Sequence, residues 1–219
     1  MARERPNPKN RKSMTKIIFA TSNQNKMREI REIMEGTDCE ILSLADASIS
    51  AKIEETGKTF AENALIKVRA IRPYTDEIIL ADDSGLEVDA LGKAPGIYSS
   101  RWMGTETPYS VKNQAIIDKL AGKTGAERSA RFVCAIAASL PDGRELTTEG
   151  TIEGQIADHP AGRGGFGYDP IVCVPELGKT TAELTDEEKN RISHRGKALR
   201  QMRDRLISLG WIAPVGVRE

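Results

Sequence analysis

The sequence lacks the features that are typical of membrane, secreted and nucleic-acid-binding proteins. Its longest nearly apolar run, Phe132–Leu140, is far too short to span a membrane. No apolar segment follows the polar, basic residues at the start, so we expect no secretory signal. Lys and Arg together number 32, as do Asp and Glu, and this balance weighs against nucleic acid as the main partner. We therefore expect neither membrane nor nucleic acid among the partners.

Cysteine is scarce, and its spacing excludes two further classes. Cys39, Cys134 and Cys173 are odd in number and far apart. They form no CxxC pair that would suggest zinc, and no disulfide framework. Cys134 and Cys173 lie in apolar, strand-like runs, which favours buried thiols in a reducing compartment. We expect a cytoplasmic protein.

The 219 residues fit one α/β domain of one or two lobes. Residues 1–14 are polar and contain two prolines, so we expect a flexible N-terminal arm there and a single domain over residues 15–212. The patterns predict strands at 16–20, 39–44, 77–81, 130–140, 145–153 and 171–174, and helices at 26–35, 59–72, 108–121, 186–192 and 195–209. Strands and helices alternate early and a hairpin comes later. This order predicts an α/β fold with a mixed, partly antiparallel sheet and flanking helices.

Polar residues follow the first predicted strand, in the stretch TSNQNK at residues 21–26. The stretch leads into a helix, whose N-terminal N–H groups and dipole favour an anion. Lys26 adds a positive charge that suits phosphate. Simple capping of the helix by Ser or Asn remains an alternative.

Two acidic pairs form the second cluster. Glu54 and Glu55 belong to IEETG, and Asp82 and Asp83 come at the end of the strand predicted at 77–81. Mg²⁺ prefers one or two carboxylates together with phosphate oxygens and water. The alternative is a plain turn, for which DDSG is also suitable.

Two further stretches carry candidate binding residues. GRGGFGYDP at 162–170 has four glycines, which permit close approach of backbone to a ligand, and Phe166 and Tyr168 could stack on a base. The stretch does not match the Walker A pattern, and a flexible surface loop is the alternative. EEKNRISHRGKAL brings Lys189, His194 and Arg195 near one another, although a solvated helix face would look similar.

The four clusters together supply anion donors, cations, a metal site and a base-stacking loop. A triphosphate carries about four negative charges near neutral pH, and metal ions with Lys or Arg hold such charge. The set therefore predicts a nucleoside triphosphate site.

The same stretches, taken together, closely resemble the inosine triphosphate pyrophosphatase family, also called the XTP/dITP diphosphatases. The matching segments are TSNQNKMREI, EETGKTFAENALIKVRA, LADDSGLEVDALGKAPGIYSSRW, GGFGYDPIV and KTTAELTDEEKNRISHRGKAL, in the family's order over residues 16–209. Two small departures are Ser22 and Lys93, each at a position where glycine is common. Neither removes a charged or donor group.

The resemblance implies two lobes around a central cleft, a homodimer and dependence on Mg²⁺. It implies a purine nucleoside triphosphate as substrate, and it carries roles over to individual residues of this sequence. Substrate contacts would come from Thr21, Ser22, Asn23, Gln24, Asn25, Lys26, Ser84, Phe166, Gly167, Tyr168, Asp169, Lys189, His194 and Arg195, metal contacts from Glu54 or Glu55 and Asp83, and catalysis from Asp83, Lys26 and Lys67.

The activity that follows is hydrolysis of ITP, dITP or XTP to the monophosphate and pyrophosphate. We expect water to attack the α-phosphorus, with Asp83 either as its base or as a metal ligand only. Two alternatives remain at this point. A related pyrophosphatase for modified pyrimidine nucleotides would keep the phosphate residues but not the ISHRG-like contacts. A non-catalytic nucleotide sensor would not need both acidic pairs.

Overall fold

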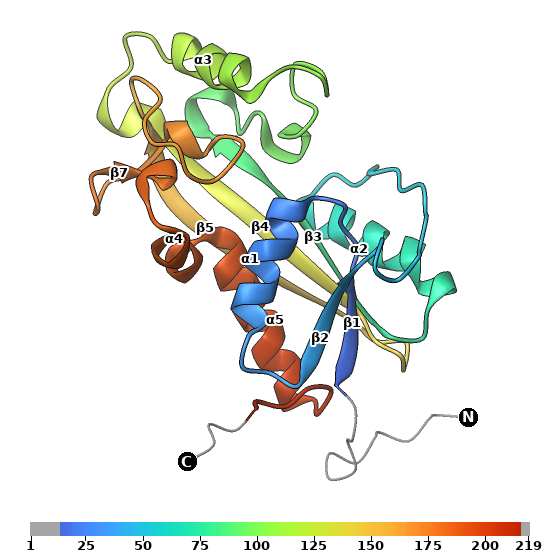
Figure 1. Ribbon diagram of the computed structural model, residues 1–219. Helices are drawn as coiled ribbons and strands as arrows, with labels where there is room; N and C mark the ends of the chain where they lie inside the picture. Colours follow the sequence, from blue (N-terminus) through green and yellow to red (C-terminus); the bar gives the residue numbers. More distant parts are fainter. Residues whose placement is uncertain (1–13, 216–219) are drawn as a thin grey trace. The chain divides into compact units, whose positions relative to one another are not determined.

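The computed structural model describes residues 14–215 (Figure 1). The strands are β1 (Thr15–Phe19), β2 (Cys39–Ser43), β3 (Ile78–Val88), β4 (Ser129–Ser139), β5 (Glu145–Ile156), β6 (Val172–Val174) and β7 (Lys179–Thr180). The α-helices are α1 (Gln24–Met34), α2 (Phe60–Ile71), α3 (Tyr109–Lys119), α4 (Asp186–Ile192) and α5 (His194–Ser208). Of the predicted arm, residues 1–13 lie outside the described residues.

The strands form one mixed sheet in the order β2-β1-β3-β4-β5-β6-β7. β1 runs parallel to β2, with Ile17 opposite Ile41, and parallel to β3, with Phe19 opposite Leu80. β6 is antiparallel to both β5 and β7. The predicted mixed α/β fold with flanking helices is therefore confirmed. The two-residue strand β7 was not predicted.

The chain divides into two compact units. Within the described residues, unit 1 comprises 14–83, 135–149 and 196–215, and unit 2 comprises 84–134 and 150–195. β3, β4 and β5 each begin in one unit and end in the other. The predicted cleft between two lobes stays a prediction.

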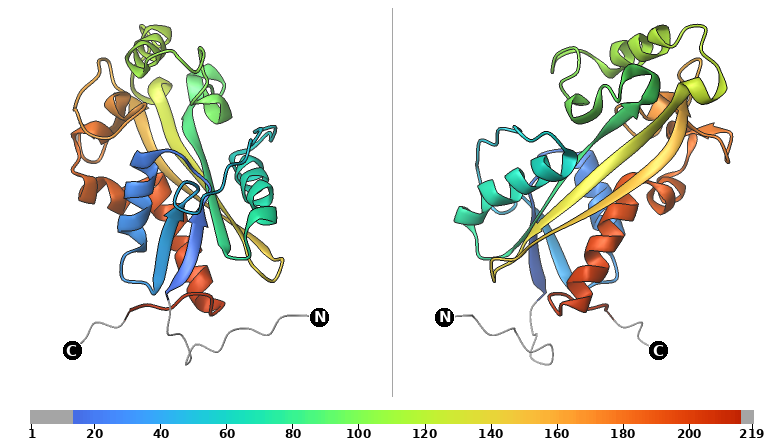
Figure 2. Two further views of the ribbon diagram at one scale, coloured as in Figure 1. Left: turned by 45° about the vertical axis from the view of Figure 1, so that its right-hand side comes forward. Right: turned by 180° about the vertical axis from the view of Figure 1, so that it is seen from behind.

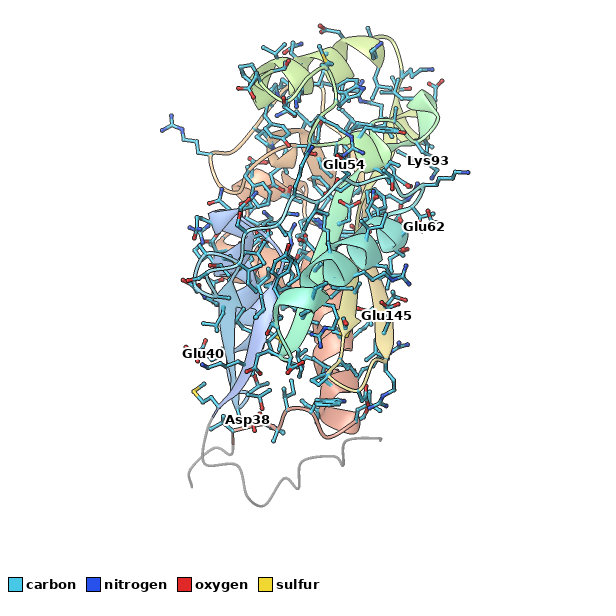
Figure 3. All side chains as sticks on the ribbon, turned by 90° about the vertical axis from the view of Figure 1, so that its right-hand side faces the viewer. Asp38, Glu40, Glu54, Glu62, Lys93 and Glu145 are labelled. Carbon is cyan, nitrogen blue, oxygen red and sulfur yellow. The ribbon has the colours of Figure 1, made fainter. Side chains whose placement is uncertain are left out.

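Side chains of unit 1 alternate across its strands, so this part of the sheet can pack helices on both faces. Ile18 and Ile79 pack with Ala64, Val68 and the rest of the apolar stripe of α2. Figure 2 shows α2 on this face, and α1 and α5 on the other. On the solvent side of α2, Arg69 pairs with Glu145 of β5 at 2.7 Å (Figure 3).

The helix α1 begins two residues earlier than its apolar pattern predicts. The side chain of Asn23 accepts hydrogen bonds from the N–H groups of Asn25 and Lys26, which satisfies donors of the first turn. Its apolar residues, led by Met27 and Ile30, are buried as the helical spacing predicts.

β3 extends well beyond its predicted end. The interpretation of Asp82 and Asp83 as residues that end a strand is wrong, because the strand continues through DDSG to Val88. Leu86 and Val88 are fully buried in the core of unit 2, and this burial favours extended backbone over a turn. Both aspartates therefore lie in mid-strand.

Among residues 14–215, none of the helices has the length and apolar character needed to cross a membrane.

All three cysteines are free thiols, and Cys39 and Cys134 are buried.

A buried arginine joins several segments of unit 2. Arg128 is 7% exposed and donates hydrogen bonds to the carbonyl oxygens of Ile156, Leu120 and Ala157 at 2.6, 3.1 and 2.8 Å. A side chain without these donors would remove one hydrogen bond from each of three carbonyl oxygens in a largely buried place.

We expect Arg128→Met to lower the free energy of unfolding by about 3 kcal/mol, because buried acceptors lose charged donors. Arg69→Met is the matched control. Its ion pair with Glu145 is exposed, and such pairs contribute about 0–1 kcal/mol. Urea unfolding followed by circular dichroism measures both. Equal losses in the two variants would contradict the role given to Arg128.

Candidate functional site

One partly buried ammonium brings two carboxylates of unit 1 together. Nζ of Lys67, on α2, lies 2.6 Å from Oε1 of Glu55 and 3.5 Å from Oδ1 of Asp83. The same ammonium donates to the backbone carbonyl of Asp82 at 2.9 Å. The side chains of Lys67 and Asp83 are only 12% and 9% exposed. We name Glu55, Lys67 and Asp83 the acidic cluster, together with Asn63, whose amide donates to Asp83.

Burial and charge shift the pKa values in this cluster. Loss of solvent raises the pKa of Asp83 above its ordinary value, although the nearby charge of Lys67 opposes the rise. For Lys67, burial lowers the pKa, but the field of Asp83, Asp82 and Glu55 outweighs this and the net shift is upward. The ammonium therefore stays charged while Asp83 is a stronger base than an exposed aspartate.

The two neighbouring glutamates differ sharply in their surroundings. Glu55 is 25% exposed in its side chain and contacts Lys67. Glu54 is 72% exposed and pairs with Lys52 at 3.2 Å (Figure 3). Both belong to the irregular segment before α2. The geometry joins Glu55, and not Glu54, to Asp83.

Asp82 and Asp83 serve opposite faces of β3. Asp83 contacts Lys67 on α2, whereas Oδ2 of Asp82 lies 2.8 Å from Nζ of Lys26 on α1. Neighbouring side chains of a strand point to opposite faces, which explains the split. The sequence suggested one acidic pair, but the fold assigns its members to different helices.

The stretch TSNQNK turns from β1 into α1. Asn23 caps the helix, and Thr21 Oγ1 accepts from the backbone N–H of Asn23 at 3.2 Å. Capping, the alternative that the sequence left open, therefore occurs. Ser22, Asn23, Gln24 and Asn25 are exposed, so their polar groups remain accessible to a ligand. Binding of phosphate here stays a prediction.

Sequence reasoning missed Asn63. Its side chain is fully buried, donates from Nδ2 to Oδ2 of Asp83 at 3.0 Å, and accepts at Oδ1 from the N–H of Gly57 at 2.8 Å. Asn63 lies four residues before Lys67, so both are on one face of α2. A signal was present, because both polar residues fall on the stripe of α2 that also holds Phe60, Ala64 and Val68.

A second cluster belongs to unit 2. Arg195 is 2% exposed and donates from Nη2 to Oγ of Ser84 at 3.1 Å. Its Cζ lies 5.7 Å from the centre of the Phe166 ring, and Nζ of Lys189 lies 5.0 Å from it. We name these four residues the aromatic–cation cluster. Lys189, His194 and Arg195 are all buried, so a solvated helix face is excluded.

Asp169 holds the glycine-rich loop in place. Its Oδ2 accepts from the N–H of Phe166 at 2.7 Å and pairs with Nζ of Lys189 at 2.8 Å, and its Oδ1 accepts from Thr181 at 2.8 Å. A Cβ on Gly165 would lie 2.1 Å from Oδ2 of Asp169, so only glycine fits there. The loop is thus ordered by a buried carboxylate.

Phe166 and Tyr168, the aromatic residues of the loop, differ in how far they are exposed. Tyr168 is 4% exposed, donates to the carbonyl oxygen of Ser99 at 2.8 Å and packs edge-on against Tyr109. The sequence suggested that both Phe166 and Tyr168 could stack on a base. Only Phe166, which is partly exposed, remains a candidate for this role.

His194 stacks on Phe132, with ring centres 5.0 Å apart. Gly167 accepts a hydrogen bond from Asn113 at 3.2 Å.

Among the candidate metal ligands, the structure brings two carboxylates together, those of Glu55 and Asp83. In the part of the chain that the structure describes, no group of three or more His, Cys, Asp or Glu side chains is arranged to hold a metal ion. Glu55 and Asp83, gathered around one lysine, match the donor set of an ion that takes one or two carboxylates and completes its shell with phosphate oxygens and water.

Comparison with known proteins gives consistent results at the level of sequence and structure. Residues 17–205 match the Ham1 family model. The dITP/XTP pyrophosphatase of Bacillus subtilis is 44% identical over 189 residues, which are 86% of this chain and 96% of that protein. The dITP/XTP pyrophosphatase of Exiguobacterium sp. (strain ATCC BAA-1283 / AT1b) is 46% identical over 192 residues, 88% of this chain and 97% of that one.

Two solved structures share the fold. The Ham1 protein of Staphylococcus aureus superposes with a TM-score of 0.80 at 38% identity, over 89% of this chain and 100% of that one. A HAM1 protein from Coxiella burnetii gives a TM-score of 0.81 at 41% identity, with the same coverage. The family model, the relatives and the shared fold agree with the motifs of residues 16–209, and the chain belongs to the Ham1 family.

Proposed function

We propose that the protein hydrolyses nonstandard purine nucleoside triphosphates, among them ITP, dITP and XTP, to the monophosphate and pyrophosphate. The enzyme thereby removes these nucleotides from the cellular pool. The observation that carries the proposal is the acidic cluster, in which Lys67 gathers Glu55 and Asp83. Relatives about as long as this chain are named dITP/XTP pyrophosphatases, which supports the substrate class.

The polyphosphate binds at the N-terminus of α1 and beside Lys26. Exposed polar groups at residues 22–25 and the helix dipole favour an anion there. Lys26 now pairs with Asp82. A bound phosphate would share this ammonium, because a lysine carries three N–H donors.

Glu55 and Asp83 hold Mg²⁺ in this proposal. Glu54, the alternative metal residue, is exposed and pairs with Lys52, which favours Glu55. Bound with the substrate, the cation supplies positive charge that neutralises the phosphate oxygens. Lys67 keeps the two carboxylates together when no cation is present.

Asp83 also orients the attacking water and takes its proton. Burial raises the pKa of this carboxyl, which makes it a better base than an exposed aspartate. Lys26 stabilises charge on the departing pyrophosphate, and Lys67 stabilises charge around the site of attack. Positioning and electrostatics of this kind dominate phosphoryl-type transfer.

The purine base binds at the aromatic–cation cluster. Phe166 supplies a ring for stacking, and the guanidinium of Arg195, next to Ser84, supplies N–H donors. Hypoxanthine and xanthine have an oxygen acceptor at position 6, whereas adenine has an amino donor there. A hydrogen-bond donor at this point therefore favours hypoxanthine and xanthine and disfavours adenine.

We further propose a cytoplasmic homodimer that acts on free nucleotides, with neither nucleic acid nor membrane as partner. The free state of all three cysteines supports a reducing compartment. The equal numbers of acidic and basic residues weigh against nucleic acid.

The position of bond cleavage tests the reaction itself. With ITP and Mg²⁺, the first products should be IMP and pyrophosphate, because attack at the α-phosphorus releases the two outer phosphates together. Anion-exchange chromatography of early time points distinguishes them. Release of IDP and orthophosphate would overturn the mechanism, and binding without any turnover would indicate a sensor.

Substitution of Asp83 tests the catalytic group. Asp83→Asn should lower kcat about 10²–10⁴-fold, the usual contribution of a general base. In the wild type, activity should fall as the pH drops through the raised pKa of Asp83, because the base is then protonated. Steady-state kinetics over a range of pH measure both effects.

Asp46→Asn is the control for this experiment. It is the same change in unit 1, at a carboxylate that pairs with Arg31 outside the acidic cluster. It should leave turnover unchanged. A folded Asp83→Asn enzyme with normal turnover would remove Asp83 from the mechanism.

Base selection tests the role of Arg195. The wild type should prefer ITP to ATP by at least roughly a hundredfold in kcat/KM, a cautious floor for a site built around one hydrogen bond. Arg195→Ala should lower kcat/KM for ITP much more than kcat/KM for ATP, so the preference for ITP becomes smaller. Arg195→Lys retains the charge and should reduce this preference too, because it loses the planar fork.

The exposed neighbour Arg191 on α4 provides the control. Arg191→Ala should keep the wild-type preference. If the Arg195 variants are folded by circular dichroism and lose both activities in equal proportion, Arg195 serves the phosphates or the fold instead.

A further inference from the structure

One side chain connects the segment that carries Glu55 with the strand that carries Asp83. Asn63 donates to Oδ2 of Asp83 at 3.0 Å and accepts from the N–H of Gly57 at 2.8 Å. It has no exposed surface. Gly57 lies two residues after Glu55, so the hydrogen bond anchors the segment close to its acidic side chain.

Gly57 fits against Asn63 so closely that no larger residue is accommodated. A Cβ at position 57 would lie 2.7 Å from Oδ1 of Asn63 and 2.9 Å from its backbone nitrogen. The φ angle of Gly57 is not in the left-handed region, so a turn does not explain the glycine. The close approach itself requires it.

We propose that Asn63 is a positioning residue that sets the distance between Glu55 and Asp83 and so shapes the divalent-cation site. The inference rests on the proposed function, since it concerns the cation used in that reaction. Lys67 attracts both carboxylates but is a single charge on a flexible stem, and it fixes no direction. The planar amide of Asn63 supplies the directional contacts.

The chemistry of the two partners explains the choice of asparagine. A carboxylate such as Asp83 only accepts hydrogen bonds, and the N–H of Gly57 only donates. A single side chain that satisfies both needs one donor and one acceptor, which an amide provides. Aspartate at position 63 would keep the acceptor for Gly57 but would replace the donor with a charge facing Asp83.

The experiment compares Asn63→Leu, Asn63→Asp and Gly57→Ala with Thr148→Val. Thr148 is a suitable control, because it is buried in unit 1 and donates to the carbonyl of Ala198 at 2.8 Å. Its loss should reduce stability without touching the acidic cluster. Three quantities are measured: the dissociation constant of Mn²⁺ alone by electron paramagnetic resonance, kcat and KM for ITP with Mg²⁺, and amide exchange at position 57 by NMR.

The three variants at positions 57 and 63 should weaken Mn²⁺ binding and lower kcat about 10–100-fold. This is the usual effect of losing a partner that orients a metal ligand. KM for ITP should change less than about twofold, because ground-state contacts of the nucleotide are retained. Amide exchange at Gly57 should accelerate in Asn63→Leu but stay slow in Asn63→Asp. Thr148→Val should match the wild type in all three.

A double variant sharpens the test. Asn63→Leu and Gly57→Ala break the same connection, so their effects on kcat should not add when combined. Additive effects, or variants of Asn63 that bind Mn²⁺ like Thr148→Val, would overturn the inference while the proposed function stands. A wild type that neither binds Mn²⁺ nor hydrolyses ITP would overturn both.

Discussion

The acidic cluster depends on the ion pairs that the ammonium of Lys67 makes with Glu55 and Asp83. A buried carboxylate and a partly buried one would repel each other and favour proton uptake if no cation lay between them. Lys67 removes this repulsion at Glu55 and Asp83, and it binds the carbonyl of Asp82 as well. Because the lysine projects from the same face of α2 as the apolar residues that pack on the sheet, the packing of that helix also sets the position of the charge.

In both units, buried charged groups are surrounded by several partners. In unit 1 a lysine is surrounded by acceptors, and in unit 2 the carboxylate of Asp169 accepts from Lys189, from Thr181 and from a backbone N–H. Removing one partner from such a set would leave a buried charge without full compensation, so the partners in each set depend on one another. The polar groups are thereby oriented before any ligand arrives, which is the condition for electrostatic catalysis.

Much of the fold could be predicted from periodicity, and the exceptions have clear causes. Helices with an apolar stripe, such as α2 and α5, were predicted to within a residue or two of their observed ends. The residues DDSG suit a turn as well as a strand, and only the burial of Leu86 and Val88 beyond them decides. Tyr168 was predicted to stack on a base because its ring lies in a glycine-rich loop, but the ring is buried and its hydroxyl donates to the carbonyl of Ser99.

In the candidate site, Glu55 and Asp83 were predictable as members of acidic pairs, and Lys67 was predictable through the resemblance to a known family alone. Asn63 was not, since a single amide in a helix has many ordinary explanations. The difference between Glu54 and Glu55 was equally hidden. It depends on which of two adjacent side chains faces Lys67, and that is settled by tertiary contacts of an irregular segment.

The mid-strand position of Asp82 and Asp83 has a consequence for how this chain can vary in evolution. Each aspartate is assigned to its helix by the two-residue repeat of the strand alone. Loss or gain of one residue before Asp82 in β3 would turn each side chain to the opposite face. One of the two lysines would then face the other aspartate, and the second would face Ser84 or Ala81 instead of a carboxylate. A change of one residue in this part of the strand therefore breaks one of the two ion pairs, whereas the irregular segment before α2 has no such two-residue repeat.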